Sequence, residues 1–259
     1  MKTLFLGDLH LMCGLILPNI ELLMDEYNVM RVVMTGDYVD QWGMIYNDYL
    51  YRKDLTYLLE WKSQKKEQGR EIITLIGNHE IPYLTGEKAV YSADSYDTFR
   101  TIRELLLALD MQVAYKVEEY LVSHSGYTVD YAVEDWHFDA INDTYTERLK
   151  TLYHHVGFCR GGSYFSGSPI WADLQGELSK RPNRNYDKQI VGHSPVSTVT
   201  KLKDIDIIAV DTFSLSREHL PLGDGSVLIY DSNKTMVAEN IWWNLNPKKI
   251  KSYLLNQEL

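Results

Sequence analysis

Five apolar runs in this sequence end in side chains of the types that bind metal ions. The residues concerned are Asp8, His10, Asp37, Asp40, Asn78, His79, His124 and His193. Carboxylate, amide and imidazole groups in combination suit Mn, Fe or Zn better than Ca or a metal held by thiolates. The sequence therefore predicts a transition-metal site. In such a site Asp37 could bridge two ions separated by about 3.5–4 Å.

Each of these residues also has an ordinary structural explanation. A Gly-Asp pair after a strand often caps the next helix. A single histidine in such a place is commonly a hydrogen-bonded structural residue, and Asn78 alone is a frequent turn residue. However, four of the eight histidines follow this one series of apolar runs. That joint pattern favours a common site over coincidence.

The first part of the chain alternates between strand and helix patterns. Residues 2–8, 30–37 and 71–78 are predicted strands, and residues 17–27 and 47–68 are predicted helices. Pro18 is expected at the start of the first helix, where proline is tolerated. This alternation predicts a parallel sheet with right-handed crossovers. Ligands bind outside the carboxyl ends of such strands, so the polar residues should meet at one edge.

The pattern differs in the second half of the chain. Residues 112–126 are predicted to form two strands joined by a tight turn at Glu118-Glu119. Further strands are predicted in a second sheet, at residues 188–194, 206–212, 226–231 and 235–240. Residues 128–185 are expected to form a cap-like insertion of helices and loops. Because no linker or repeat divides the sequence, we expect a single α/β domain over residues 1–259 with two packed sheets.

Composition excludes several classes of protein. The net charge of −10 argues against general nucleic-acid binding, although metal ions could still provide positive charge for a small phosphorylated substrate. Cys13 and Cys159 lack the CxxC spacing and fit a reducing compartment. The N-terminal apolar run is too short for a signal peptide, and no run is long enough to span a membrane. These features predict a soluble, cytoplasmic protein with no membrane partner.

Five short motifs, in order, carry a resemblance to a known family. GDLH, GDYVD, GNHE, SHSG and GHSPV resemble those of the calcineurin-like metallophosphoesterases. The most similar branch is that of the phosphoprotein phosphatases, which includes bacterial and phage Ser/Thr phosphatases and diadenosine-tetraphosphate hydrolases. The resemblance spans residues 3 to 213, and SPIWADL (168–174) resembles the Trp-containing stretch of those enzymes. It implies a two-sheet αββα sandwich with the metal site at the carboxyl ends of the strands.

The resemblance also implies a role for each motif residue. Asp8 and His10 would bind the first metal ion, Asp37 would bridge, and Asn78, His124 and His193 would hold the second ion. His79 would be the general acid for the leaving oxygen, oriented by Asp40. These roles are chemically reasonable, because two cations neutralise a phosphoryl group and lower the pKa of a water molecule. The protein then needs to supply only a proton donor.

The sequence departs from the family pattern at two positions. Leu11 replaces a glycine, which predicts a bulkier, reshaped loop. Gln41 replaces an arginine that grips the phosphate oxygens, and an amide does not reproduce bidentate guanidinium binding. One explanation is a substrate with less charge on each phosphorus, such as a diester. The other is a compensating arginine, for which the candidates are Arg160, Arg181 and Arg184.

Three hypotheses for function follow. The first is a phosphomonoesterase of the Ser/Thr protein phosphatase type that uses two divalent ions, with Mn as first choice and Fe or Zn as alternatives. The second is a dinucleoside polyphosphate hydrolase or nucleotide phosphodiesterase. The third is a non-catalytic scaffold with the same fold, which the presence of His79 and all the metal positions disfavours. The expected partner is accordingly a phosphoprotein, a nucleotide or a small phosphorylated molecule.

Overall fold

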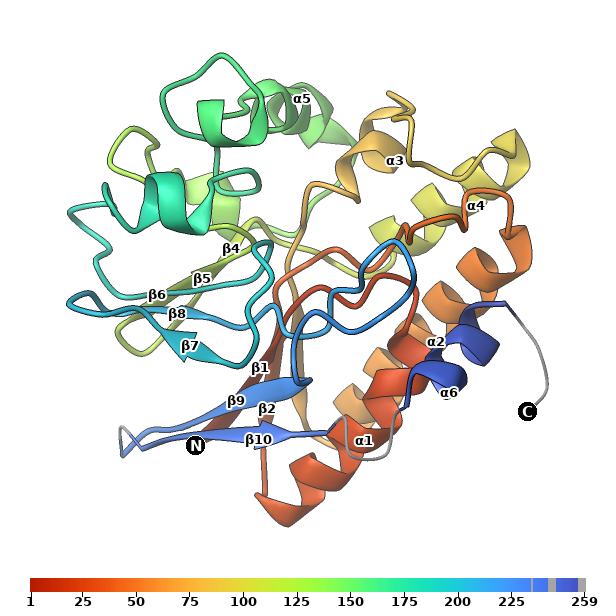
Figure 1. The fold of residues 1–259 in the computed structure, drawn as a ribbon, viewed down its shortest axis with the longest axis horizontal. Coiled ribbons are helices and arrows are strands. Elements are labelled where there is room, and N and C mark those ends of the chain that lie inside the picture. The colour runs from red at the N-terminus through yellow and green to blue at the C-terminus, as the bar shows by residue number, and fades with distance from the viewer. Residues whose placement is uncertain (234, 242–245, 256–259) are drawn as a thin grey trace.

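Two five-stranded sheets form the centre of the protein in a computed structural model, which describes residues 1–233, 235–241 and 246–255. The strand order is β10-β9-β1-β2-β3 in the first sheet and β4-β5-β6-β8-β7 in the second. Figure 1 shows the helices α1, α2, α4 and α6 on one side of the first sheet and the second sheet on its other side. The predicted two-sheet α/β architecture is therefore confirmed.

The first sheet is built on three parallel strands. Its members are β1 (Lys2–Leu6), β2 (Arg31–Met34), β3 (Glu71–Thr74), β9 (Ser226–Asp231) and β10 (Met236–Asn240). Strands β1, β2 and β3 are parallel, as the sequence predicts. The prediction that residues 226–231 and 235–240 join the second sheet is wrong, because β9 pairs antiparallel with β1 and β10 with β9. The apolar pattern of β9 predicts a buried strand but does not specify its partner.

The second sheet contains the predicted hairpin. Its strands are β4 (Ala114–Val117), β5 (Tyr120–Ser123), β6 (Gln189–Val191), β7 (Thr200–Lys201) and β8 (Ile207–Ala209). The hairpin turns at Glu118, which has a positive φ of 50°. Strands β5, β6 and β8 are parallel, so their carboxyl ends lie at one edge. That edge carries His124 after β5 and His193 after β6.

Helices cover the outer face of the first sheet. They are α1 (Cys13–Glu26), α2 (Asp48–Glu67), α4 (Tyr96–Leu107) and α6 (Pro247–Leu254), whereas the short helix α3 (Ile81–Thr85) packs against α4 near the site. The prediction that Pro18 starts the first helix is wrong, because α1 begins at Cys13 and contains Pro18. The carboxylate of Asp54 on α2 accepts hydrogen bonds from the backbone N–H groups of Cys13 and Gly14, at 2.9 and 3.0 Å. This distant residue satisfies the helix start, which explains why the local sequence did not reveal it.

Residues 128–185 consist of short helices and loops, as expected. They contain α5 (Thr146–His154), three 3-10 turns (Asp135–Phe138, Asp143–Tyr145 and Phe158–Arg160) and a π-helical turn (Leu174–Leu178). Leu174 and Leu178 pack on Val191 and Ile207, which lie in the second sheet. The insertion therefore supplies an outer layer to that sheet. None of the helices in the described ranges is both long and apolar enough to cross a membrane.

Alternate residues of the central strands bury opposite faces. On β1, Phe5 packs in a cluster with Val122 and Ile190 of the second sheet. Its neighbours Leu4 and Leu6 instead belong to the core under the helices. Both faces are thus covered, which explains why β1 is a continuous apolar run rather than an alternating one. The carboxyl ends of the buried strands are left as the place where polar side chains gather.

Candidate metal centre

The predicted site residues lie on sharp loops that follow the strands. Backbone φ angles are positive at Asp8, His10, Asp37, Asp40 and His193, between 30° and 64°. This left-handed conformation is costly for residues other than glycine and persists only where the surrounding structure imposes it. The loops turn back over the strand ends, and their side chains converge.

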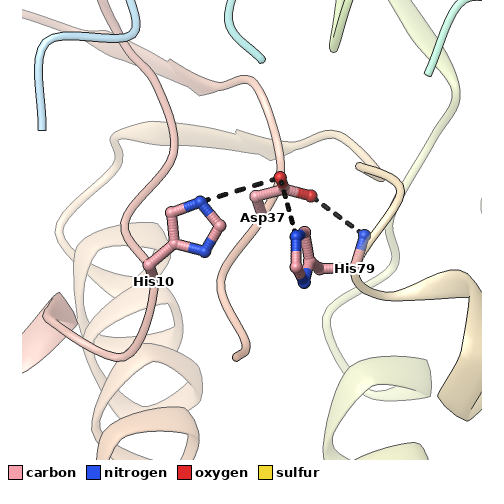
Figure 2. Close-up of side chains that lie close together, drawn as sticks. All are labelled: His10, Asp37 and His79. Atoms are coloured by element: carbon pink, nitrogen blue, oxygen red, sulfur yellow. Dashed lines mark hydrogen bonds and ion pairs between the residues drawn. The ribbon is translucent and has the colours of Figure 1, made fainter. Parts of the chain in front are cut away.

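The carboxylate of Asp37 lies at the centre of this group (Figure 2). Its Oδ2 atom is 3.8 Å from His10 Nε2, 4.0 Å from His79 Nε2 and 3.4 Å from His124 Nε2. Its Oδ1 atom accepts a hydrogen bond from the backbone N–H of His79 at 3.0 Å. Burial alone would raise the pKa of Asp37, but His124, His79 and His10 hold it well below its usual value. The shared carboxylate is therefore negatively charged.

A second cluster of side chains adjoins Asp37. His124 Nε2 lies 3.0 Å from Asn78 Oδ1 and 3.0 Å from His193 Nδ1. The backbone N–H of His193 donates to both carboxylate oxygens of Asp8, at 3.1 and 3.0 Å. The structure thus brings together residues that are far apart in the sequence, as the strand-end pattern predicted.

Hydrogen bonds to backbone carbonyls fix two of the imidazole rings. His10 Nδ1 lies 3.2 Å from the carbonyl oxygen of Val39 and 2.9 Å from that of Asp40, and His124 Nδ1 lies 2.9 Å from that of Thr35. Because a carbonyl oxygen only accepts, Nδ1 of each ring carries the proton. The other nitrogen, Nε2, faces Asp37. This is the arrangement in which histidine binds metals, with the second nitrogen held by a backbone acceptor.

The chemistry of these donors fits divalent ions. Two groups that share Asp37 have ligand atoms within 4.8 Å of one another, namely His10, Asp37 and His79, and Asp37, His124 and His193. Burial lowers the pKa of His124, but the charges of Asp37 and Asp8 outweigh burial and raise it to about 9. The nitrogen that faces Asp37 therefore lies where positive charge is favoured. The buried Nε2 atom of His193 has no hydrogen-bond partner among the described residues.

Asp211 is a buried carboxylate beside this site that the sequence analysis missed. Burial and the charge of Asp211 raise the pKa of Asp8 well above its usual value. Two carboxylates in a buried region would be costly without a compensating cation. The sequence pattern that identified the other site residues could also have identified Asp211, because Asp211 directly follows the apolar run IIAV at β8.

Glycines before two of the polar residues allow the loops to approach closely. Gly36 has a φ of 109°, and a Cβ atom there would lie 2.5 Å from the backbone nitrogen of Gly77. A Cβ atom on Gly77 would lie 2.1 Å from Asp37 Oδ1. The GD and GN pairs are therefore required by the contact between these two loops. Leu11, the departure from the family glycine, also has a positive φ (59°), and its side chain is fully buried in the core.

The carboxylate of Glu80 joins the same two loops. It is fully buried and accepts backbone N–H groups from Gly77 at 2.8 Å, Asp37 at 2.9 Å and Tyr38 at 2.7 Å. Burial and the charge of Asp37 raise its pKa to about 7. Glu80 therefore fixes the backbone from which Asp37, Asn78 and His79 project. Glu80 is the last residue of the GNHE motif, and the sequence alone suggested no role for it.

His79 and Asp40 form a hydrogen-bonded pair. His79 Nδ1 lies 3.0 Å from Asp40 Oδ2, and Asp40 Oδ1 accepts hydroxyl groups from Tyr51 at 2.8 Å and Tyr83 at 2.5 Å. Burial lowers the pKa of His79, but Asp37 and Asp40 raise it to about 9. The ring of Tyr91 lies 4.5 Å from that of His79. The imidazole is thus fixed on one nitrogen, while the other, Nε2, faces the site.

A cavity of about 650 Å³ opens over these residues. Gln41 lies in its wall, where the side chain accepts the N–H of Trp42 at 2.8 Å and donates to the carbonyl of His10 at 3.4 Å. Arg160 also lines the cavity, and donates to Ser194 Oγ at 2.7 Å. Arg181 and Arg184 do not line it: Arg181 pairs with Asp130 at 2.7 Å, and Arg184 is exposed.

Comparison with known protein families identifies the family to which this fold belongs. The family model described as calcineurin-like phosphoesterase matches residues 1–207, and the chain belongs to this family of hydrolases, which generally bind divalent metals. The predicted resemblance is thus confirmed. No curated protein sequence matches the chain.

Two solved structures illustrate the shared fold. A cold-active protein-tyrosine phosphatase from a psychrophilic Shewanella has a TM-score of 0.58 and 18% identity, over 92% of this chain and 80% of that one. A protein serine/threonine phosphatase from Saccharomyces cerevisiae has a TM-score of 0.55 and 15% identity, over 93% of this chain and 79% of that one. At these identities the likeness concerns the fold.

The contacts of Glu80 lead to a prediction about stability. We expect Glu80→Gln to lower the free energy of unfolding by about 1–3 kcal/mol, because one accepting oxygen becomes an NH2 group and a buried backbone N–H is left without an acceptor. Chemical denaturation at pH 8, above the pKa of Glu80, would measure the change. Glu26→Gln is the matched control, since Glu26 is exposed at the end of α1. Equal stability of the two variants would contradict the role of Glu80.

Proposed function

We propose that this protein is a phosphomonoesterase of the protein phosphatase type that uses two divalent metal ions. The observation that carries the proposal is the buried carboxylate of Asp37, which lies close to His10 as well as to His124 and His193 and lines a cavity. A hydrolysis screen with phosphomonoesters, phosphodiesters and dinucleoside polyphosphates in the presence of Mn tests it. Activity confined to the diesters or dinucleotides, or no activity at all, would overturn the proposal.

The candidate ligands divide into two sets. Asp8 and His10 would hold one ion, Asn78, His124 and His193 the other, and Asp37 would belong to both. Ions bound there would supply positive charge to a phosphoryl group and lower the pKa of a water molecule. We propose Mn as the first candidate, because the donors are oxygen and nitrogen atoms without a thiolate.

His79 is the proposed general acid. Its Nδ1 atom is engaged by Asp40, so Nε2 is the nitrogen available to protonate a leaving oxygen. The hydroxyl groups of Tyr51 and Tyr83 hold the carboxylate of Asp40 from the other side. Asp40 is thus a positioning residue, because it fixes the ring and stabilises its charged form.

Arg160 is the proposed substitute for the arginine that Gln41 replaces. Its guanidinium is held by Ser194 and by an ion pair with Asp173, whose Oδ2 atom lies 3.2 Å from Nε. A guanidinium has five N–H donors, so some remain for phosphate oxygens. The position of Arg160 in the cavity supports the compensating-arginine explanation of Gln41 over a weakly charged substrate.

The proposed compartment is the cytoplasm, which the free thiols of Cys13 and Cys159 support.

Metal loading provides the first prediction for this function. We expect the protein to bind two Mn ions per chain by elemental analysis after removal of excess metal. Asp37→Asn should reduce binding at both positions, whereas His193→Ala should mainly weaken one, because His193 belongs to a single group. His154→Ala is the control, since His154 is exposed and pairs with Glu87. A maximum of one ion in the unmodified protein would contradict the two-metal proposal.

Replacement of the general acid should affect turnover but not metal content. We expect His79→Asn to lower kcat by about 10²–10⁴, the usual contribution of a positioned acid. The loss should be smaller for nitrophenyl phosphate than for an alkyl phosphate, because nitrophenolate needs less protonation. An equal loss with both substrates would mean that His79 binds or orients the substrate instead.

Replacement of Arg160 and replacement of Arg181 should have different effects on the KM for phosphomonoesters. We expect Arg160→Ala to raise the KM for phosphomonoesters by about 10–100-fold, because hydrogen bonds between charged partners are lost. Arg160→Lys should restore only part of the binding, since an ammonium group lacks the planar fork. Arg181→Ala should leave the KM unchanged. If Arg181→Ala raises the KM and Arg160→Ala does not, the assignment is wrong.

A further inference from the structure

The lining of the cavity over the candidate metal centre has a charged part and an apolar part. Arg160 is the charged part, held by Ser194 next to His193. The apolar wall, as we call it, comprises Trp42, Ile45, Val90, Tyr91, Leu215 and Leu222, whereas Trp171 and Pro195 line the cavity close to His193. A phosphate monoester is likewise divided, into a charged phosphoryl group and a leaving group. The two parts of the lining therefore fit the two ends of one substrate.

The position of His79 decides which end faces the apolar wall. Its Nε2 atom is the proton donor in the proposed function, so the leaving oxygen must come next to this nitrogen. The ring of Tyr91 lies 4.5 Å from the imidazole of His79. Tyr91 is itself held by a hydrogen bond of 2.7 Å between its hydroxyl group and that of Tyr153 on α5. The group attached to the leaving oxygen therefore emerges beside a fixed aromatic ring.

Contacts between loops hold the rest of the apolar wall in place. The backbone N–H of Asp94 donates to the carbonyl of Ile45 at 2.8 Å, which joins the loop of Trp42 to the loop of Val90 and Tyr91. His219 Nε2 lies 2.8 Å from the carbonyl oxygen of Trp42. The guanidinium of Arg217 lies 4.9 Å from the centre of the Trp42 ring. The wall is thus a connected surface rather than a set of isolated side chains.

Three of these apolar groups are exposed although they adjoin a buried polar site. The exposed fraction is 50% for Trp42, 96% for Val90 and 49% for Leu222. Apolar side chains gathered at the mouth of a cavity commonly mark a binding surface. Arg160 is the one lysine or arginine among the described residues that line the cavity, and Arg217, which packs on the Trp42 ring, lies outside that lining. The wall therefore fits an uncharged, flat group.

We propose that the substrates are phosphomonoesters with an aromatic leaving group, whose ring packs between Tyr91 and Trp42; this inference rests on the proposed function. Aromatic rings pair favourably in offset or edge-to-face arrangements, and a phenyl group buries a large apolar area. In the reaction, water adds its oxygen to phosphorus and the bond from phosphorus to the aryl oxygen breaks. The electron pair stays on that oxygen and His79 gives it a proton. One proton of the water stays on the phosphate and the other restores His79 by way of the solvent, so a phenol and inorganic phosphate are released.

Binding of two phosphonates tests the inference without any leaving-group chemistry. Benzylphosphonate and ethylphosphonate carry the same charged group and differ in the ring. We expect the Mn-loaded protein to bind benzylphosphonate at least 10-fold more tightly by isothermal titration calorimetry, from burial of the ring. Trp42→Ala and Val90→Ser should each reduce that ratio by about threefold or more. Tyr96→Ala is the control, because Tyr96 is 87% exposed and does not line the cavity.

The outcomes distinguish this inference from the proposed function. Equal affinity for the two phosphonates, in a protein that hydrolyses phosphomonoesters, would overturn the aromatic subsite and leave the proposed function intact. Absence of phosphonate binding together with absence of hydrolysis would overturn both. Loss of the ratio in Tyr96→Ala as well as in Trp42→Ala would also overturn the subsite.

A comparison of substrates identifies the source of the aromatic group. Phenyl phosphate and a phosphotyrosine peptide share the aryl ester, so hydrolysis of both in preference to a phosphoserine peptide supports the subsite. Similar kcat/KM values for the first two would indicate that the ring alone is recognised. A value at least 10-fold higher for the peptide would indicate a protein tyrosine side chain as the source. Preference for the phosphoserine peptide would overturn the inference.

Discussion

The buried negative charge of Asp37 is the constraint on which the rest of the site depends. A carboxylate removed from water is costly unless opposite charges and hydrogen-bond donors surround it. Here three imidazoles face Oδ2 and the N–H of His79 binds Oδ1. The strand ends, the tight loops and the orientation of the rings together place these donors around the Asp37 carboxylate. Among the described residues, two groups of candidate ligands share Asp37.

The backbone around Asp37 is held in an unfavourable conformation by neighbours that are remote in sequence. Glu80 accepts N–H groups from both loops, and the absence of a side chain at Gly36 and Gly77 lets the loops touch. This arrangement requires positive φ angles at residues such as Asp37 and Asp40, and these backbone conformations are energetically unfavourable. A rigid floor results, on which side chains are fixed before any substrate arrives. Such preorganisation is what catalysis of phosphoryl transfer requires from a protein.

The cavity above this floor would constrain the two ends of the substrate in different ways. Charge defines one end, where Arg160 lies beside His193. Shape and hydrophobicity define the other, where Tyr91 and Trp42 border His79 and the cavity mouth. The insertion contributes to both ends, through Arg160 itself and through Tyr153, which binds Tyr91. A segment that contains none of the five family-like motifs thus shapes the part of the site that faces the substrate.

The sequence by itself determined the strands β1, β2 and β3 and the polar residues at their ends. Both faces of β1 and β2 are buried, so continuous apolar runs mark them, and the polar residue that ends each run marks the edge of the sheet. Only the tertiary structure decided that β9 pairs with β1, that Asp54 starts α1 at Cys13, and that Arg160 rather than Arg181 enters the cavity. The reason is that local periodicity specifies which residues are buried. Partners separated by tens or hundreds of residues are chosen by packing, which a local pattern does not contain.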